Sequence, residues 1–163
     1  MSALTKFFLL FFLPFFVACA QPSTLIGEKA KKHIFEGEIK ERKGKKIATG
    51  CHHYAAVLNG IARIIVNTES LGPRGIFKGR VMLYDPRHKI WVKKVANGGY
   101  STFFPKDWSI QKTLQEITHA YEHKDKVSRG TNEYKGLSSE GIEIRMYLKE
   151  GGEIISAFPA DWK

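Results

Sequence analysis

A strict alternation of apolar and polar residues near the end of the chain limits the fold more than any other feature. The apolar set is Ile142, Ile144, Met146 and Leu148, and the polar set is Glu143, Arg145, Tyr147 and Lys149. A period of two is the pattern of a β-strand that buries one face. The glycine-rich segment 150–153 can turn the chain so that the apolar segment 154–158 pairs back. The sequence therefore predicts an antiparallel hairpin packed on a core.

Other strands are predicted further upstream. Residues 77–84 and 89–95 are rich in β-branched and aromatic residues, and they flank an Asp-Pro turn at 85–88. Residues 60–68 are also rich in β-branched residues and predict a strand, whereas the polar, basic segment 41–50 predicts a loop. Antiparallel sheets are therefore expected to form most of the molecule.

Two helices complete the predicted fold. Ser109 is a good N-cap for residues 110–123, where apolar side chains recur at helical spacing. Residues 24–35 predict a shorter helix near the N-terminus. We therefore expect an α+β fold of mainly antiparallel β-sheets, with an N-terminal helix and one central helix.

Residues 1–20 have the pattern of an export signal. Lys6 precedes an uncharged apolar run at 7–18 that ends in small residues. This run is shorter than the roughly 20 residues that span a bilayer. Cleavage after Ala20 would release a protein beginning at Gln21, whereas a lipobox at 16–19 would leave a lipid anchor on Cys19. Both alternatives predict an exported protein, either secreted or periplasmic, or held at a membrane by Cys19.

The remaining chain has no repeat, low-complexity tract or dividing linker. We interpret residues 21–28 as a tether and residues 29–163 as one domain, expected to be a monomer. The full chain of 163 residues carries 26 Lys and Arg against 16 Asp and Glu, a formal net charge of +10. Such a balance favours polyanions, RNA among them, as partners.

Histidines supply the chemistry that a basic exported domain could use. His33 precedes the basic segment, and His52 and His53 follow it in the sequence GCHHY. Cleavage of RNA without a metal needs a base for the ribose 2′-OH, an acid for the leaving oxygen and a cation for the phosphorane. Imidazole suits the first two roles because its pKa is about 6.5, and lysine suits the third.

Four segments of the chain resemble the motif blocks of the bacterial EndoU endoribonuclease family. They are HIFEGEI at 33–39, TGCHHY at 49–54, GGYSTFFPKDWS at 98–109 and GGEIISAFP at 151–159. The resemblance covers nearly the whole chain after the tether. It implies an EndoU nuclease domain with an RNase A-like two-histidine mechanism and no metal or other cofactor. It also implies that RNA is cleaved, often at uridines, to leave a 2′,3′-cyclic phosphate.

The resemblance assigns catalytic roles to individual residues. His33 corresponds to the general acid and His52 to the general base. The family lysine lies between the second histidine and the STFFP block, where we assign it to Lys94. Lys93 is the first alternative because neighbouring strand residues face opposite ways, and Lys106 is the second.

Substrate-binding positions follow from the same resemblance. They are Ser156, Phe158 and Thr102. His53 lies where relatives vary, and it is expected either to pack in the fold or to contact RNA. The family has tyrosine where this chain has Phe158, which can stack on a base but has no hydroxyl. Ser156 keeps a hydroxyl on the same face of the strand, so we expect cleavage after pyrimidines with a weak preference for U over C.

The other histidines, His88, His119 and His123, are expected to be surface residues. Cys51 is expected to be a buried apolar residue rather than a zinc ligand, because no second cysteine accompanies it at zinc-finger spacing. The sequence thus predicts an exported RNA endonuclease, a toxin or effector with a neutralising immunity protein as partner. The alternative is an exported lipoprotein that binds RNA or another polyanion without cutting it.

Overall fold

The computed structural model describes residues 25–160. The predicted export signal, Cys19 and positions 21–24 of the predicted tether lie outside the described residues. The described part of that tether packs on the domain, since Ile26 is only 5% exposed and the Leu25 carbonyl accepts from the Ile154 N–H. Within 25–160, no helix has the length and apolar character required to cross a membrane.

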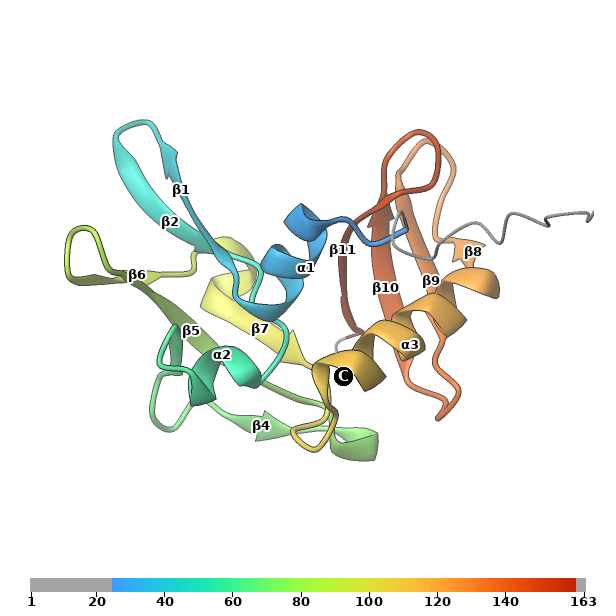
Figure 1. The fold of residues 1–163 in the computed structure, drawn as a ribbon, viewed down its shortest axis with the longest axis horizontal. Coiled ribbons are helices and arrows are strands. Elements are labelled where there is room, and N and C mark those ends of the chain that lie inside the picture. The colour runs from blue at the N-terminus through green and yellow to red at the C-terminus, as the bar shows by residue number, and fades with distance from the viewer. Residues whose placement is uncertain (1–24, 161–163) are drawn as a thin grey trace, which may run out of the picture.

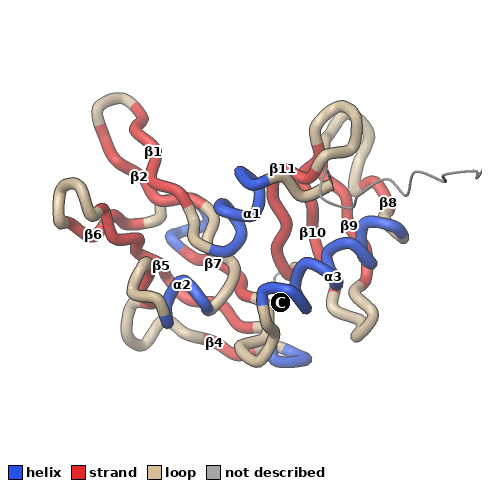
Figure 2. The backbone as a smooth tube through the Cα atoms, viewed as in Figure 1, coloured by secondary structure: helices blue, strands red, loops and turns tan. Residues whose placement is uncertain are grey.

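The described chain is built mainly from strands and loops (Figure 2). The helices are α1 (Glu28–Phe35), α2 (Ala55–Leu58) and α3 (Ile110–Glu122), with short 3₁₀ turns at Pro73–Gly75 and Ala96–Gly99. The strands are β1 (Glu38–Arg42), β2 (Lys45–Thr49), β3 (Ala62–Ile64), β4 (Ser70–Leu71), β5 (Phe77–Asp85), β6 (Ile90–Lys93), β7 (Tyr100–Phe103), β8 (Asp125–Lys126), β9 (Glu133–Leu137), β10 (Glu143–Leu148) and β11 (Ile154–Pro159). The predicted α+β class, with its N-terminal and central helices, is confirmed.

The N-terminal half is organised around the long strand β5. Strands β3 and β6 pair with its second part, and β4 and β7 pair with its first part, all antiparallel. Between β6 and β7, which both pair with β5, the chain makes the turn at Ala96–Gly99. The apolar core of this half includes Phe77, Val81, Leu83 and Phe103.

The C-terminal half is an antiparallel sheet in the order β11-β10-β9-β8, with α3 packed along it (Figure 1). Buried residues alternate along β10, as the sequence predicts, and the alternation places Ile144 and Met146 in the core. Ser109 caps α3 by accepting a hydrogen bond from the Lys112 N–H at 3.0 Å. Helix α1 lies between the two halves and contacts β11 (Figure 1).

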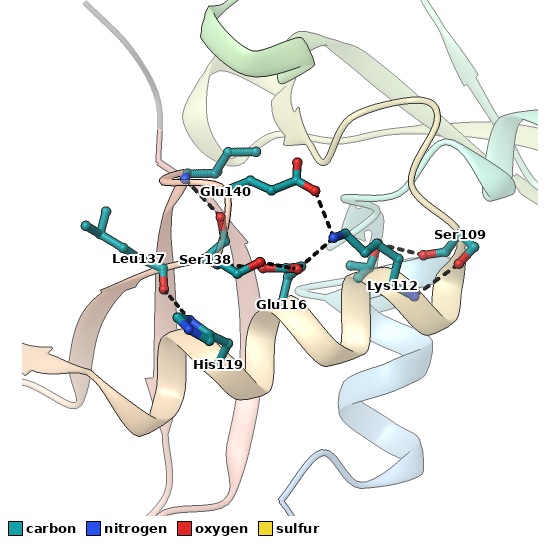
Figure 3. A network of polar contacts seen from close by, with 10 residues as sticks. Ser109, Lys112, Glu116, His119, Leu137, Ser138 and Glu140 are labelled. Atoms are coloured by element: carbon teal, nitrogen blue, oxygen red, sulfur yellow. Dashed lines mark hydrogen bonds and ion pairs between the residues drawn. The ribbon is translucent and has the colours of Figure 1, made fainter.

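A polar network fixes α3 to the loop between β9 and β10 (Figure 3). Glu116, which is buried, accepts hydrogen bonds from the N–H and Oγ of Ser139, both at 2.7 Å. Lys112 lies between Glu116 and Glu140, at 2.9 and 2.8 Å. Burial acts to raise the pKa of Glu116, but the bonds from Lys112 and Ser139 outweigh it, so the pKa is lowered and the carboxylate stays charged.

Two sequence predictions are wrong in detail. The segment 41–50 is not a loop but contributes to the hairpin of β1 and β2, which pair from Glu38–Thr49 to Arg42–Lys45. Its turn is formed by Lys43 and Gly44, both with positive φ, as in tight hairpins. Of the predicted strand at 60–68, only Ala62–Ile64 forms a strand, β3. A turn follows, in which the Thr68 N–H donates to the Ile65 carbonyl and Val66 is exposed.

Candidate active site

The two histidines assigned to catalysis meet because a turn at Gly50 and Cys51 packs against the end of α1. Both residues have positive φ, 72° and 64°, and a Cβ on Gly50 would lie 2.2 Å from the His33 carbonyl oxygen. The N–H groups of Cys51 and His52 donate to the carbonyls of His33 and Ile34 at 2.9 and 2.7 Å. These carbonyls belong to the last turn of α1, where no further helical N–H group is present to bond them. The backbone thus holds the two imidazole rings with centroids 6.3 Å apart.

His52 is placed to act as a base. Its Nδ1 lies 2.8 Å from the Thr102 carbonyl oxygen, and because a carbonyl only accepts, this nitrogen carries the proton. Burial, reinforced by the charge of Lys94, holds the pKa of His52 well below its usual value. The ring is therefore neutral near pH 7, with an unprotonated Nε2.

His33 has a different environment. Its Nδ1 lies 3.0 Å from Oε2 of Glu38, on β1, and Lys40 lies 3.0 Å from the same oxygen. Burial lowers the pKa of His33, but the hydrogen bond and charge of Glu38 oppose this effect. His33 therefore holds a proton more readily than His52, which suits an acid. Glu38 was not predicted as a site residue, although it lies within the first motif at 33–39.

Lys94 directly follows the last residue of β6 and forms a parallel bridge with Ala48. It is 8% exposed, and its Nζ donates to Ser101 Oγ at 2.6 Å and to the Gly50 carbonyl at 3.1 Å. Burial lowers its pKa to about 8, so the ammonium is still charged at neutral pH. The same Gly50 that brings the histidines together also positions this cation.

These three side chains line one cleft of ≈ 1160 Å³ between the two halves of the molecule. One wall comes from the N-terminal half and includes Thr68, Ser70, Lys78, Asn97, Tyr100 and Thr102. The other comes from the C-terminal sheet and its approach, and includes Asn132, Glu133, Arg145, Tyr147, Ile155, Ser156 and Phe158. The cleft thus combines histidines and a buried lysine with aromatic and cationic side chains.

Neither alternative lysine is in this cleft. Lys93 is exposed at the end of β6. Lys106 forms an ion pair with Glu69 at 2.8 Å and lies over the rings of Tyr54 and Phe77. Of the three candidates, Lys94 alone shares the cleft with the histidines.

The substrate-binding candidates divide into two groups. Phe158, Ser156 and Thr102 line the cleft, and Phe158 stacks on His52 with centroids 5.1 Å apart. Thr102 also joins the two halves, because its hydroxyl donates to the Pro159 carbonyl at 2.7 Å.

His53, in contrast, does not line the cleft. It is 5% exposed, its Nε2 lies 3.0 Å from the Trp108 carbonyl oxygen, and its Nδ1 accepts from the Ala55 N–H at 3.1 Å. Both ring nitrogens are therefore engaged in structural hydrogen bonds. Of the two adjacent buried histidines, only His52 lines the cleft.

Cys51 lies in the core beside the catalytic candidates. It is fully buried, and burial raises the pKa of its thiol to about 12, which keeps the thiol protonated. In the described part of the chain, no three His, Cys, Asp or Glu side chains are gathered as metal ligands would be. His88 and His123 are exposed, while His119 is half-buried and donates to the Leu137 carbonyl at 3.1 Å.

Comparison with known proteins agrees with the motifs. The family model for the bacterial EndoU nuclease matches residues 27–161. A protein of Bacillus cereus named "Toxin" is 42% identical over 142 residues, which cover 86% of this chain and 23% of that protein. The chain thus spans about a quarter of the length of this relative. None of the solved structures gives a significant match. The resemblance inferred from the four motifs is confirmed, and the chain belongs to the bacterial EndoU nuclease family.

Proposed function

We propose that this protein is an endoribonuclease that cuts single-stranded RNA after pyrimidines, most readily after uridine. The observation that carries the proposal is the convergence of His33, His52 and Lys94 in one cleft. Family membership supports the nuclease activity. The net charge of +10 supports a polyanionic substrate.

The first step is attack by the ribose 2′-OH on the adjacent phosphorus. The nucleophile is part of the substrate and already lies near the phosphorus, so little entropy is lost in bringing the two together. His52 takes the hydroxyl proton on Nε2, which is free because Nδ1 is bonded to the Thr102 carbonyl. The new bond joins the 2′-oxygen to phosphorus.

The second step breaks the bond between phosphorus and the 5′-oxygen. His33 gives its proton to this leaving oxygen, while Glu38 stabilises the protonated ring beforehand. The products are a 2′,3′-cyclic phosphate and a free 5′-hydroxyl. At the end of the reaction His33 has lost its proton to the leaving oxygen, and His52 has gained the proton of the 2′-OH. Proton exchange with solvent must therefore return both histidines to their starting states.

Lys94 stabilises the charge that develops between these steps. Its ammonium is held by Ser101 and the Gly50 carbonyl, so it is oriented before substrate arrives. A fixed cation in a partly dry site stabilises a dianionic phosphorane more than it stabilises the starting phosphodiester. Its contribution therefore falls mainly on turnover.

The biological role that we propose is that of an exported toxin or effector. The similarity to the B. cereus protein named "Toxin" supports it, as does the signal-like sequence of residues 1–20. A cell that makes such an RNase needs protection, which export and a neutralising immunity protein would supply. Mass spectrometry of the mature N-terminus would distinguish release at Gln21 from lipid on Cys19.

The test of the activity is incubation of the purified chain with a fluorescent oligonucleotide that contains one uridine, in EDTA. We expect cleavage by the wild type and none above background by His52→Ala. Tight, salt-sensitive binding without cleavage by the wild type would instead support the non-catalytic binding protein. Binding should weaken steeply with salt in either case, because lysines and arginines displace counterions from phosphates.

A further inference from the structure

The cleft face of the C-terminal sheet carries a row of hydroxyl and carboxylate side chains beside Phe158. On β10, Tyr147 is directly opposite Ser156 of β11 and Glu133 of β9. Directly paired residues point to the same face of a sheet, and all three line the cleft. The next pair on the same face of the sheet is Arg145 and Phe158.

The aromatic rings on this face extend outward from the catalytic base. Phe158 stacks on His52 at 5.1 Å between centroids, so part of its surface is already covered. Tyr147 lies 6.0 Å from Phe158, with the rings inclined at 34°. The base of the nucleotide whose 2′-OH reaches His52 would therefore lie close to both rings. Tyr147 brings to this place the hydroxyl that Phe158 lacks.

The polar groups around Tyr147 are fixed in position. Arg145 donates to Glu133 Oε1 at 3.0 Å, while its Nε is buried without a hydrogen-bond partner among the described residues, 3.7 Å from Glu143 Oε1. Burial raises the pKa of the Tyr147 hydroxyl, and both the charge of Glu133 and a hydrogen bond to it add to this effect. The hydroxyl therefore stays protonated. Arg145 has five N–H donors, more than its contact with Glu133 uses.

We propose that Tyr147 is a specificity-determining residue that reads the hydrogen-bonding edge of the base 5′ to the scissile phosphate, with Glu133, which Arg145 fixes, holding it in place. The inference rests on the proposed ribonuclease function. Its consequence is a preference for U over C stronger than Phe158 and Ser156 alone would give. A site built to hydrogen-bond one edge discriminates because the wrong base leaves its polar groups unpaired.

The experiment uses the full chain and oligonucleotides with one ribonucleotide, U or C, in a 2′-O-methyl background. We expect the ratio of kcat/KM for U over C to fall about 3- to 10-fold in Tyr147→Phe, the effect of one hydrogen bond. Cleavage after C should change little, whereas a general structural defect would lower it as well. Adding Phe158→Tyr to Tyr147→Phe should restore part of the ratio.

Tyr100→Phe is the matched control, because Tyr100 lines the opposite wall of the same cleft. It should leave the U/C ratio unchanged. A wild-type ratio retained in Tyr147→Phe would overturn the inference while leaving the ribonuclease function intact. If the wild type cuts neither substrate, the proposed function fails. The affinities of fully 2′-O-methylated U and C oligonucleotides for wild type and Tyr147→Phe would then decide the inference alone.

Discussion

The floor of the cleft and its C-terminal wall are constructed in different ways. On the floor, His33, His52 and Lys94 are held by backbone carbonyls or by a carboxylate, and they come from separate parts of the chain. On the wall, Phe158 and Tyr147 are placed by strand register and are half-buried. The hydrogen bonds that hold the floor come from Glu38 and from the Thr102 and Gly50 carbonyls rather than from this wall. The two parts touch where Phe158 stacks on His52. We therefore expect wall changes that keep this stack to alter recognition more than catalysis.

The largest effects are expected on the floor, from removal of either of the two histidines that we propose to transfer protons. His33→Ala and His52→Ala should each lower the cleavage rate by about 10²–10⁴-fold, the usual contribution of a positioned acid or base. Single-turnover rates on a uridine oligonucleotide would measure this. His53→Ala is the control: it should keep most of the activity but unfold at a lower temperature, because it loses two buried hydrogen bonds. An inactive His53→Ala beside an active His52→Ala would refute the assignment.

Loss of the buried cation should come next. Lys94→Met should reduce kcat by about 10²–10³-fold, as removal of one transition-state donor does elsewhere. The affinity for an uncleavable 2′-O-methyl oligonucleotide should change far less, because the charge matters most in the transition state. Lys93→Met is the neighbouring exposed control and should behave like the wild type. Equal losses in kcat and binding would make Lys94 a binding residue only.

The pH profile distinguishes the two histidines. The base must be unprotonated and the acid protonated, so kcat/KM should be highest between the pKa of His52 and that of His33. Both pKa values lie below 6.5 and that of His52 is the lower, so we expect an optimum below pH 6.5. Glu38→Gln removes a contact that raises the pKa of His33, and the alkaline limb should therefore move to lower pH. An alkaline limb that does not move would show that Glu38 does not tune His33.

Substitutions on the wall should have smaller effects, and these should fall on recognition of the substrate base. Phe158→Ala should weaken substrate binding about 5- to 150-fold, the range of one lost base stack. Phe158→Tyr should bind as well as the wild type and sharpen the preference for U over C. Measured KM values and U/C ratios would test both. A fall in kcat for Phe158→Tyr equal to that of His52→Ala would mean that the wall and floor are not independent.

The sequence predicts the parts of the fold that bury one face. The alternation that ends in Leu148 becomes β10, and the cap at Ser109 begins α3. The β1–β2 hairpin was missed because most of its side chains are polar and, of the ten residues in its two strands, Ala48 alone is fully buried. Its strands pair through backbone groups, which the side-chain pattern does not report.

The site could be predicted only in part. The motifs give His33 and His52, but the contact between His33 and Glu38 depends on the turn between α1 and β1. Alternation could not decide between Lys93 and Lys94, because β6 ends at Lys93 and Lys94 lies beyond it. Tyr147 was predicted as an exposed-face residue of a strand. Its position near Phe158 required the register of β10 and β11.

The central claim is that the ribose 2′-OH is the nucleophile and that His33, His52 and Lys94 promote its attack. Mass spectrometry of the fragments from a single-uridine oligonucleotide, cut in EDTA, tests it most directly. The account predicts a 5′ fragment ending in a 2′,3′-cyclic phosphate, a 3′ fragment with a free 5′-hydroxyl, and no cleavage when that uridine is 2′-O-methylated. Fragments with a 5′-phosphate, or cleavage of the methylated oligonucleotide, would contradict it.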